Sequence, residues 1–157
     1  FMFLVGETAT SNDVVDDLES EGEKLKVLAE TEREAVIKSR IGQGDFRRNL
    51  IRLWGACSVT GLRNVSLLRA SHIKPWRNSS NRERLDTYNG LLLMPTYDLL
   101  FDKGYVSFTD RGRIILSREI AADEYEFLGV HQNDNLRKVE DEHRRYLRFH
   151  RDSMFRG

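Results

Sequence analysis

The centre of the chain carries short apolar runs separated by one long polar loop, an arrangement that few folds accommodate. Residues 65–73 have the composition of a strand, and residues 74–88 after them are rich in Arg, Asn and Ser. Residues 90–94 form a second short apolar strand, Pro95 interrupts the run, and residues 96–102 have the spacing of a short helix. We therefore predict a strand, loop, strand, helix unit at the centre.

Helical patterns precede this unit. Helix formers recur among charges over residues 24–40, which predicts a helix. Gly42 and Gly44 are expected to interrupt it. Asp45 can cap a second helix, which Gly55 ends.

The segments after the unit predict a hairpin and a terminal helix. Residues 105–108 and 113–116 alternate as strands around the turn residues 109–112. Apolar residues at helical spacing over residues 136–155 predict an amphipathic helix that packs on the domain. The fold class is therefore α+β, with flanking N- and C-terminal helices and an added β-hairpin.

Charge is segregated along the chain although the formal net charge is zero. Residues 1–32 carry a net charge of −7, residues 33–87 carry +8, and residues 88–157 carry −1. The middle segment is the candidate surface for a polyanion, unless the acidic segment neutralises it within the fold. We divide the chain into an acidic arm or linker at 1–30 and a domain at 31–157, whose central unit spans about 65–104.

Cysteine usage and hydropathy place the chain among intracellular proteins. Cys57 is the one cysteine, so neither a disulfide framework nor a cysteine-based zinc knuckle can form within one chain. No apolar run approaches the roughly 20 residues needed to cross a bilayer. We expect a cytoplasmic protein without a membrane partner. Because the first residue is Phe1 rather than Met, an upstream specificity domain can be missing from this chain.

One histidine and three polar residues carry the candidate chemistry. His72 ends the first predicted strand, Asn89 follows seventeen residues later, and Asp98 nine residues after that. Asp102 lies one helical turn beyond Asp98, so the two carboxylates share a helix face and can hold one hard cation. We expect His72 and both acids to converge on one pocket open to solvent. A neutral histidine and a divalent cation suit phosphodiester hydrolysis.

Each of these residues also has an ordinary structural interpretation. His72 can be a loop histidine, and Asn89 with Gly90 is a common turn dipeptide. Asp98 can be a helix N-terminal charge, and Asp102 a structural acid. The basic side chains around His72 suit phosphate contacts, although single surface arginines are usually solvated. The candidate DNA-binding residues are Arg69, Lys74, Arg77, Arg82 and Arg84.

Three ordered blocks resemble the restriction-type HNH endonuclease family. They are ASHIKPW (residues 70–76), NGLLL (residues 89–93) and LFDKG (residues 100–104). The resemblance covers roughly residues 30–120 and implies a ββα-metal core, also called the His-Me finger. It further implies cleavage of double-stranded DNA to 5′-phosphate and 3′-hydroxyl ends.

The resemblance assigns a role to each matching position. His72 corresponds to the general base, and Asn89 to the asparagine that braces the loop and orients that base. Asp98 stands at a metal-ligand position, Asp102 where some relatives have a further ligand, and Ser71 where many members have an acidic or histidine ligand. Such oxygen donors favour Mg²⁺ or Mn²⁺ over zinc.

Two further expectations and one alternative follow from the resemblance. A single HNH site cuts one strand, so we expect a homodimer on DNA for double-strand cleavage. The departures at Ser71 and Asp98 leave open a catalytically degenerate HNH-fold DNA-binding module. A protein interaction domain without salt-sensitive DNA affinity is a third interpretation.

Overall fold

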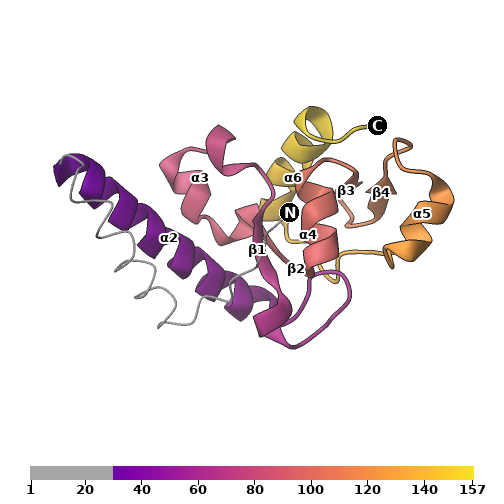
Figure 1. Ribbon diagram of the computed structural model, residues 1–157, viewed down its shortest axis with the longest axis horizontal. Helices are drawn as coiled ribbons and strands as arrows, with labels where there is room; N and C mark the ends of the chain where they lie inside the picture. Colours follow the sequence, from indigo (N-terminus) through magenta and orange to yellow (C-terminus); the bar gives the residue numbers. More distant parts are fainter. Residues whose placement is uncertain (1–29) are drawn as a thin grey trace.

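Two antiparallel strands and the helix that follows them lie at the centre of the computed structural model, which describes residues 30–157 (Figure 1). Strand β1 (Arg69–His72) pairs with β2 (Gly90–Leu93), so that Arg69 lies opposite Leu93 and His72 opposite Gly90. Helix α4 (Pro95–Asp102) contacts both strands. Pro95 begins α4 because its missing N–H and fixed φ suit the first turn of a helix.

One long helix replaces the two helices predicted before this unit. Helix α2 (Glu30–Trp54) runs through Gly42 and Gly44 without a break, so the predicted interruption is wrong. Each glycine costs about 1 kcal/mol relative to alanine, but the buried Phe46 and Leu50 anchor the helix to the core. Gly55, at a φ of 68°, ends α2 as expected. Residues 1–29, with the acidic arm and the predicted helix start at 24, lie outside the described residues.

The first strand is shorter than the prediction of residues 65–73. A 3₁₀ turn, η1 (Val65–Leu67), precedes β1. The Asn64 side chain accepts from the backbone N–H of Ser66, and the Arg47 guanidinium donates to the carbonyls of Val65 and Leu68, both at 2.8 Å. These side chains satisfy backbone groups locally, so this stretch does not extend the strand ladder.

The polar loop between β1 and β2 contains three short helical segments. They are η2 (Trp76–Asn78), α3 (Asn81–Leu85) and η3 (Thr87–Asn89). Ser80 caps α3 while the Glu83 side chain accepts from the backbone N–H of Ser80, which forms a capping box. The loop is therefore a folded element with its own hydrogen bonds.

A second two-stranded sheet and two helices complete the described chain. Strands β3 (Val106–Phe108) and β4 (Ile114–Leu116) pair antiparallel, and α5 (Ala122–Phe127) and α6 (Asp141–Ser153) follow. Helix α6 starts later than the predicted residue 136. The backbone N–H of Leu136 donates to Gly112 and that of Arg137 to Ser58, which keeps this stretch extended.

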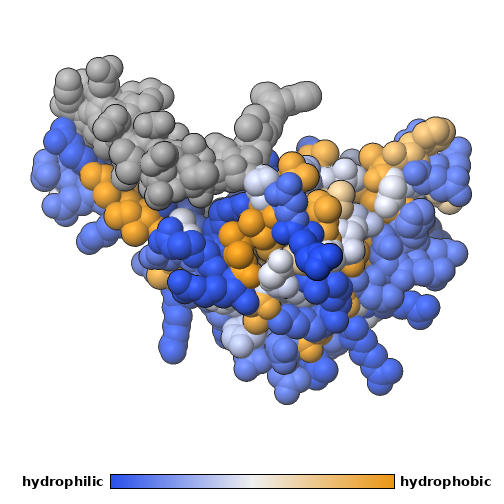
Figure 2. Space-filling view, turned by 90° about the horizontal axis from the view of Figure 1, so that it is seen from below, coloured by the Kyte–Doolittle hydropathy of each residue, from blue (hydrophilic) through white to orange (hydrophobic). Residues whose placement is uncertain are grey.

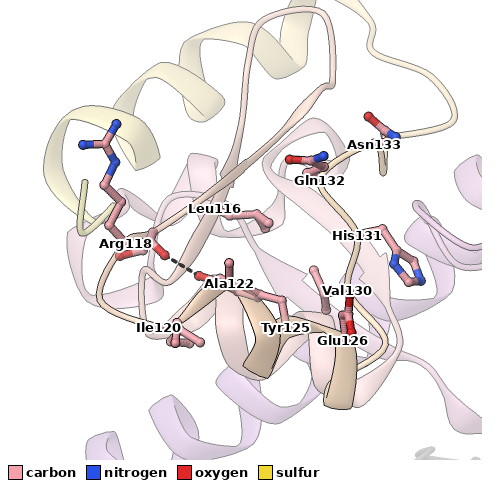
Figure 3. Close-up of a pocket in the computed structure, with 12 residues that line it drawn as sticks. Leu116, Arg118, Ile120, Ala122, Tyr125, Glu126, Val130, His131, Gln132 and Asn133 are labelled. Carbon is pink, nitrogen blue, oxygen red and sulfur yellow. Dashed lines mark hydrogen bonds between the residues drawn. The ribbon is translucent and has the colours of Figure 1, made fainter.

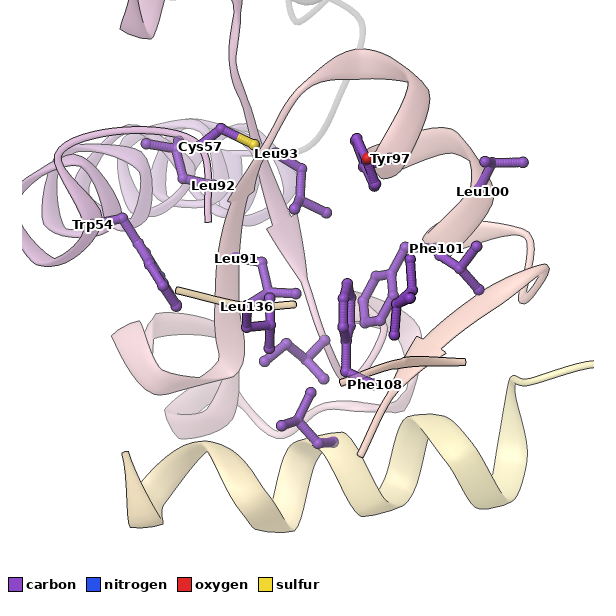
Figure 4. Packing of buried hydrophobic residues seen from close by; sticks show 14 of the residues in the cluster. Trp54, Cys57, Leu91, Leu92, Leu93, Tyr97, Leu100, Phe101, Phe108 and Leu136 are labelled. Atoms are coloured by element: carbon purple, nitrogen blue, oxygen red, sulfur yellow. The ribbon is translucent and has the colours of Figure 1, made fainter. Parts of the chain in front are cut away.

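The core gathers side chains from both sheets and from helices α2, α4, α5 and α6. The rings of Phe101 and Phe108 lie 5.7 Å apart above α6, and Leu91 to Leu93 of β2 are fully buried (Figure 4). On the face shown in Figure 2, polar side chains predominate and apolar side chains gather in small patches. None of the helices formed by residues 30–157 has the length and hydrophobicity to cross a bilayer.

His150 fastens α6 to the core with both ring nitrogens. Nε2 donates to the carbonyl of Phe101 (2.8 Å), Nδ1 accepts from the hydroxyl of Ser107 (2.8 Å), and the imidazole stacks on the Phe101 ring at 3.7 Å. The residue is 1% exposed, and burial lowers its pKa from 6.5 to about 4. This arrangement holds the imidazole neutral.

We predict that the free energy of unfolding falls as the pH falls from 6.5 to about 4. In that range the unfolded chain binds a proton at His150 more tightly than the folded chain, so protonation favours unfolding; the full loss is about 3 kcal/mol. Urea unfolding at pH 7 and pH 5 measures the change in the free energy of unfolding. Burial also lowers the pKa of His72 and His143, so the His150→Gln variant is measured beside the parent to isolate the contribution of His150. Equal pH dependence in the variant and the parent would contradict the prediction.

Candidate active site

Alternation along β1 divides the candidate residues between two sides of the strand. Successive side chains of a strand point to opposite faces, so Ser71 and His72 face opposite ways. Ser71 is buried and hydrogen-bonds to Asp98 of α4, whereas His72 contacts Phe46 of α2. The strand thus has a carboxylate side and an imidazole side.

The His72 ring is packed between two aromatic side chains. The Phe46 ring is parallel to the imidazole, with ring centres 3.9 Å apart and an angle of 7° between the planes. Trp76 meets the imidazole edge-on at 5.7 Å. Phe46 can reach His72 because residue 90, opposite His72, is glycine; a Cβ at Gly90 would come within 2.6 Å of the Phe46 ring. The imidazole is therefore half-buried.

The hydrogen bond of His72 determines which nitrogen carries the proton. Nε2 lies 2.9 Å from the carbonyl oxygen of Arg84. Because a carbonyl only accepts, Nε2 is the protonated nitrogen of the neutral ring and Nδ1 has the lone pair. Within the described chain Nδ1 makes no hydrogen bond. Burial, with a smaller contribution from the charge of Arg84, lowers the pKa of His72 and favours the neutral form.

Asn89 ties both ends of the polar loop together. It is fully buried; its Oδ1 accepts from the N–H of Lys74 (2.8 Å), and its Nδ2 donates to the carbonyl of Glu83 (3.0 Å). The N–H of Ile73 donates to the carbonyl of Asn89 (3.0 Å). These bonds hold the start of the loop beside its end, next to His72.

Asp98 lies on the opposite side of β1 with two partners from that strand. Ser71 hydrogen-bonds to its carboxylate, and Nε of Arg69 lies 3.6 Å from its Oδ2. Burial raises the pKa of Asp98, and these two partners oppose the rise. Asp102, one turn further along α4, is exposed, and its charge also raises the pKa of Asp98.

The structure does not bring all predicted site residues into one cluster. Ser71, Asp98 and Arg69 come together on the side of α4, whereas His72 and Asn89 lie with the polar loop. Over residues 30–157 no group of three or more His, Cys, Asp or Glu side chains could hold a metal ion. The candidate residues thus divide between the two sides of β1, because adjacent strand residues face opposite ways.

The five candidate DNA-binding residues fall into two groups. Arg69 lies near Asp98, Lys74 pairs with Glu83 at 3.0 Å, and the Arg84 side chain bonds within the loop. Arg77 and Arg82 are exposed, and within residues 30–157 neither forms a hydrogen bond or an ion pair.

Two residues around the imidazole have no direct signal in the sequence. Phe46 lies in a segment predicted as helix, 26 positions before His72, and that pattern does not indicate a contact with the histidine. Arg84 acts on His72 through its backbone carbonyl, which every residue type has. The glycine at position 90 was a usable signal, since a glycine inside a strand can mark a close approach of other atoms.

A hollow of about 620 Å³ lies elsewhere, between β4 and α5 (Figure 3). Its apolar lining includes Leu116, Ile120 and Val130, and its polar lining includes Arg118 and His131. It contains none of the candidate site residues.

A comparison with known protein families finds a match over the central unit of the chain. Residues 57–109 match a family described as HNH endonuclease. The match takes in β1, the polar loop, β2, α4 and β3. No curated protein matches the chain.

Proposed function

Because residues 57–109 form an HNH-family domain, we propose that the protein is a metal-dependent, restriction-type DNA endonuclease with His72 as its general base. The observation that carries this proposal is the bond from Nε2 of His72 to the Arg84 carbonyl. This bond leaves the lone pair of Nδ1 able to accept a proton, while the packing of Phe46 and Trp76 holds the ring in place. The lowered pKa of His72 keeps that lone pair available at neutral pH.

In the proposed reaction, Nδ1 of His72 takes a proton from water as the water oxygen attacks phosphorus. The bond from phosphorus to the 3′ oxygen breaks, the electron pair leaves with that oxygen, and solvent protonates it. Asn89 keeps the loop, and with it the Arg84 carbonyl, in place beside the ring. The products have 5′-phosphate and 3′-hydroxyl ends.

The side chains on the α4 side offer oxygen atoms, the type of ligand that Mg²⁺ and Mn²⁺ prefer. Asp98 and Asp102 supply carboxylates on one helix face, and the Ser71 hydroxyl already bonds to Asp98. Two carboxylates and a hydroxyl leave coordination positions for water and a DNA phosphate. Once bound, such an ion would neutralise negative charge that develops on the phosphate.

The proposed substrate is double-stranded DNA held through its phosphates. Arg77 and Arg82 are the foremost contacts, because both are exposed on the loop that flanks His72. Arg69 and Lys74 would join them by exchanging their carboxylate partners for phosphate. We propose a homodimer for cleavage of both strands.

We predict that nicking of supercoiled plasmid requires Mg²⁺ or Mn²⁺ and stops in excess chelator. Asp98→Asn is expected to raise the metal concentration needed for half-maximal rate by 10-fold or more, since it removes one of two carboxylates. Asp123→Asn on α5, an exposed helix acid outside the proposed site, is the control and should behave as the parent. Unchanged cutting in excess chelator would refute the metal requirement.

Two observations favour the alternative of a non-catalytic DNA-binding module. Arg69 lies beside Asp98, and the described residues hold no three-member ligand group. A binding module predicts salt-sensitive DNA affinity with no cleavage in any divalent metal. Metal-dependent nicking distinguishes the two.

A further inference from the structure

Arg82 and Arg84 lie two residues apart on α3, but the structure uses their side chains differently. Arg82 is exposed, and among residues 30–157 it has no hydrogen-bonded or ionic partner. Arg84 is half-buried: its Nε donates to the carbonyl of Trp76 (3.0 Å) and its Nη1 to Oδ1 of Asn81 (3.2 Å). The donors of Arg84 are thus already directed into the loop.

The Arg84 guanidinium also stacks on the side chain that flanks the imidazole. Its central carbon lies 4.5 Å from the centre of the Trp76 ring, a cation–π arrangement. Trp76 in turn meets the His72 ring edge-on. Arg84 therefore contacts His72 directly, through its carbonyl oxygen at Nε2, and indirectly, through the Trp76 ring.

Three groups therefore contact the imidazole: Phe46 stacks on one face, Trp76 packs nearly perpendicular to the ring, and the Arg84 carbonyl accepts from Nε2. The guanidinium bond to the Trp76 carbonyl holds α3 against η2, and so helps to determine where the Arg84 carbonyl lies. A flat group with several donors in fixed directions is required for this combination, which a lysine ammonium does not provide.

We propose that Arg84 is a positioning residue for His72, acting through Trp76 and through its own carbonyl, and that it is not a DNA contact. The proposal rests on the role of His72 as general base. Arg82 remains a phosphate contact, so two arginines that look equivalent in the sequence have different functions.

Three variants of the full chain separate these functions: Arg84→Met, Arg84→Lys and Arg82→Met. Plasmid nicking is measured over a range of DNA concentrations, and DNA binding over a range of salt. Arg84→Met and Arg84→Lys are both expected to lower kcat, by about 100-fold if the reacting groups shift by about 1 Å. Arg82→Met is expected to raise KM and to reduce the slope of log affinity against log salt by about 0.9.

The ring nitrogens of His72 provide a readout that does not depend on cleavage. In the parent, ¹⁵N NMR should show one neutral tautomer with Nε2 protonated, and in both Arg84 variants a mixture of tautomers. If His72→Ala still cuts DNA, the proposed function fails while the tautomer result still tests Arg84. A single Nε2-protonated tautomer together with parental kcat in Arg84→Lys, or an Arg84→Met variant that changes only KM and salt slope, would overturn the proposal.

Discussion

Replacing His72 with alanine is expected to lower the rate of DNA cleavage at saturating DNA by about 10²–10⁴-fold, the usual contribution of a general base. Nε2 of the imidazole donates to the Arg84 carbonyl, which leaves Nδ1 to take a proton from water. DNA affinity should stay near the parental value, because the variant leaves Arg77 and Arg82, the exposed phosphate contacts proposed above, unchanged. The measurement is the first-order rate of plasmid nicking with Mg²⁺, beside a gel-shift titration.

Two further variants make this result interpretable. His72→Gln keeps a donor for the Arg84 carbonyl but has no basic nitrogen, so it should be as inactive as the alanine variant. His131→Ala removes an exposed histidine between α5 and α6 and should cut at the parental rate. Cleavage by either His72 variant within tenfold of the parent would refute the assignment of the base.

The largest expected loss of stability comes from Gly104→Ala. Gly104 has a φ of 80°, and an added Cβ would lie 2.0 Å from the backbone carbonyl oxygen of Met154. The N–H of Arg156 also donates to the Gly104 carbonyl at 2.8 Å, so the end of α6 cannot move away without losing that bond. Left-handed backbone costs about 1 kcal/mol and overpacking about 1–3 kcal/mol more. We expect a loss of about 3 kcal/mol in urea unfolding.

Gly129→Ala is the matched control for this prediction. Gly129 has a φ of 71°, close to that of Gly104, but an added Cβ there would meet nothing within 4 Å. It should therefore lose only the backbone contribution, about 1 kcal/mol. Equal losses in the two variants would show that the contact with Met154 contributes nothing.

Local patterns in the sequence were sufficient for much of the central unit. The apolar run at β2 lies where the residues indicated, α4 begins one residue before the predicted range 96–102, and β1 pairs with β2. These features depend on alternation and on turn chemistry within a few residues, which a single sequence displays directly. The match of residues 57–109 to the HNH family agrees with the resemblance of the three blocks.

What the sequence could not provide depends on contacts between distant residues. The half-burial of His72 follows from Phe46, which packs across Gly90 from another element. Continuity of α2 through Gly42 and Gly44 follows from packing that outweighs helix propensity. The late start of α6 follows from backbone bonds of residues 136 and 137 to distant loops.

The segment that matches the family is fastened on both sides by helices that lie outside it. Phe46 and Leu50 of α2 are buried against β2, and Tyr146 of α6 donates to Asp86 of the polar loop at 2.6 Å. Residues 57–109 alone would expose these surfaces to water. Transfer of this segment to another scaffold would therefore need both helices, or equivalent cover for these surfaces, to keep its fold.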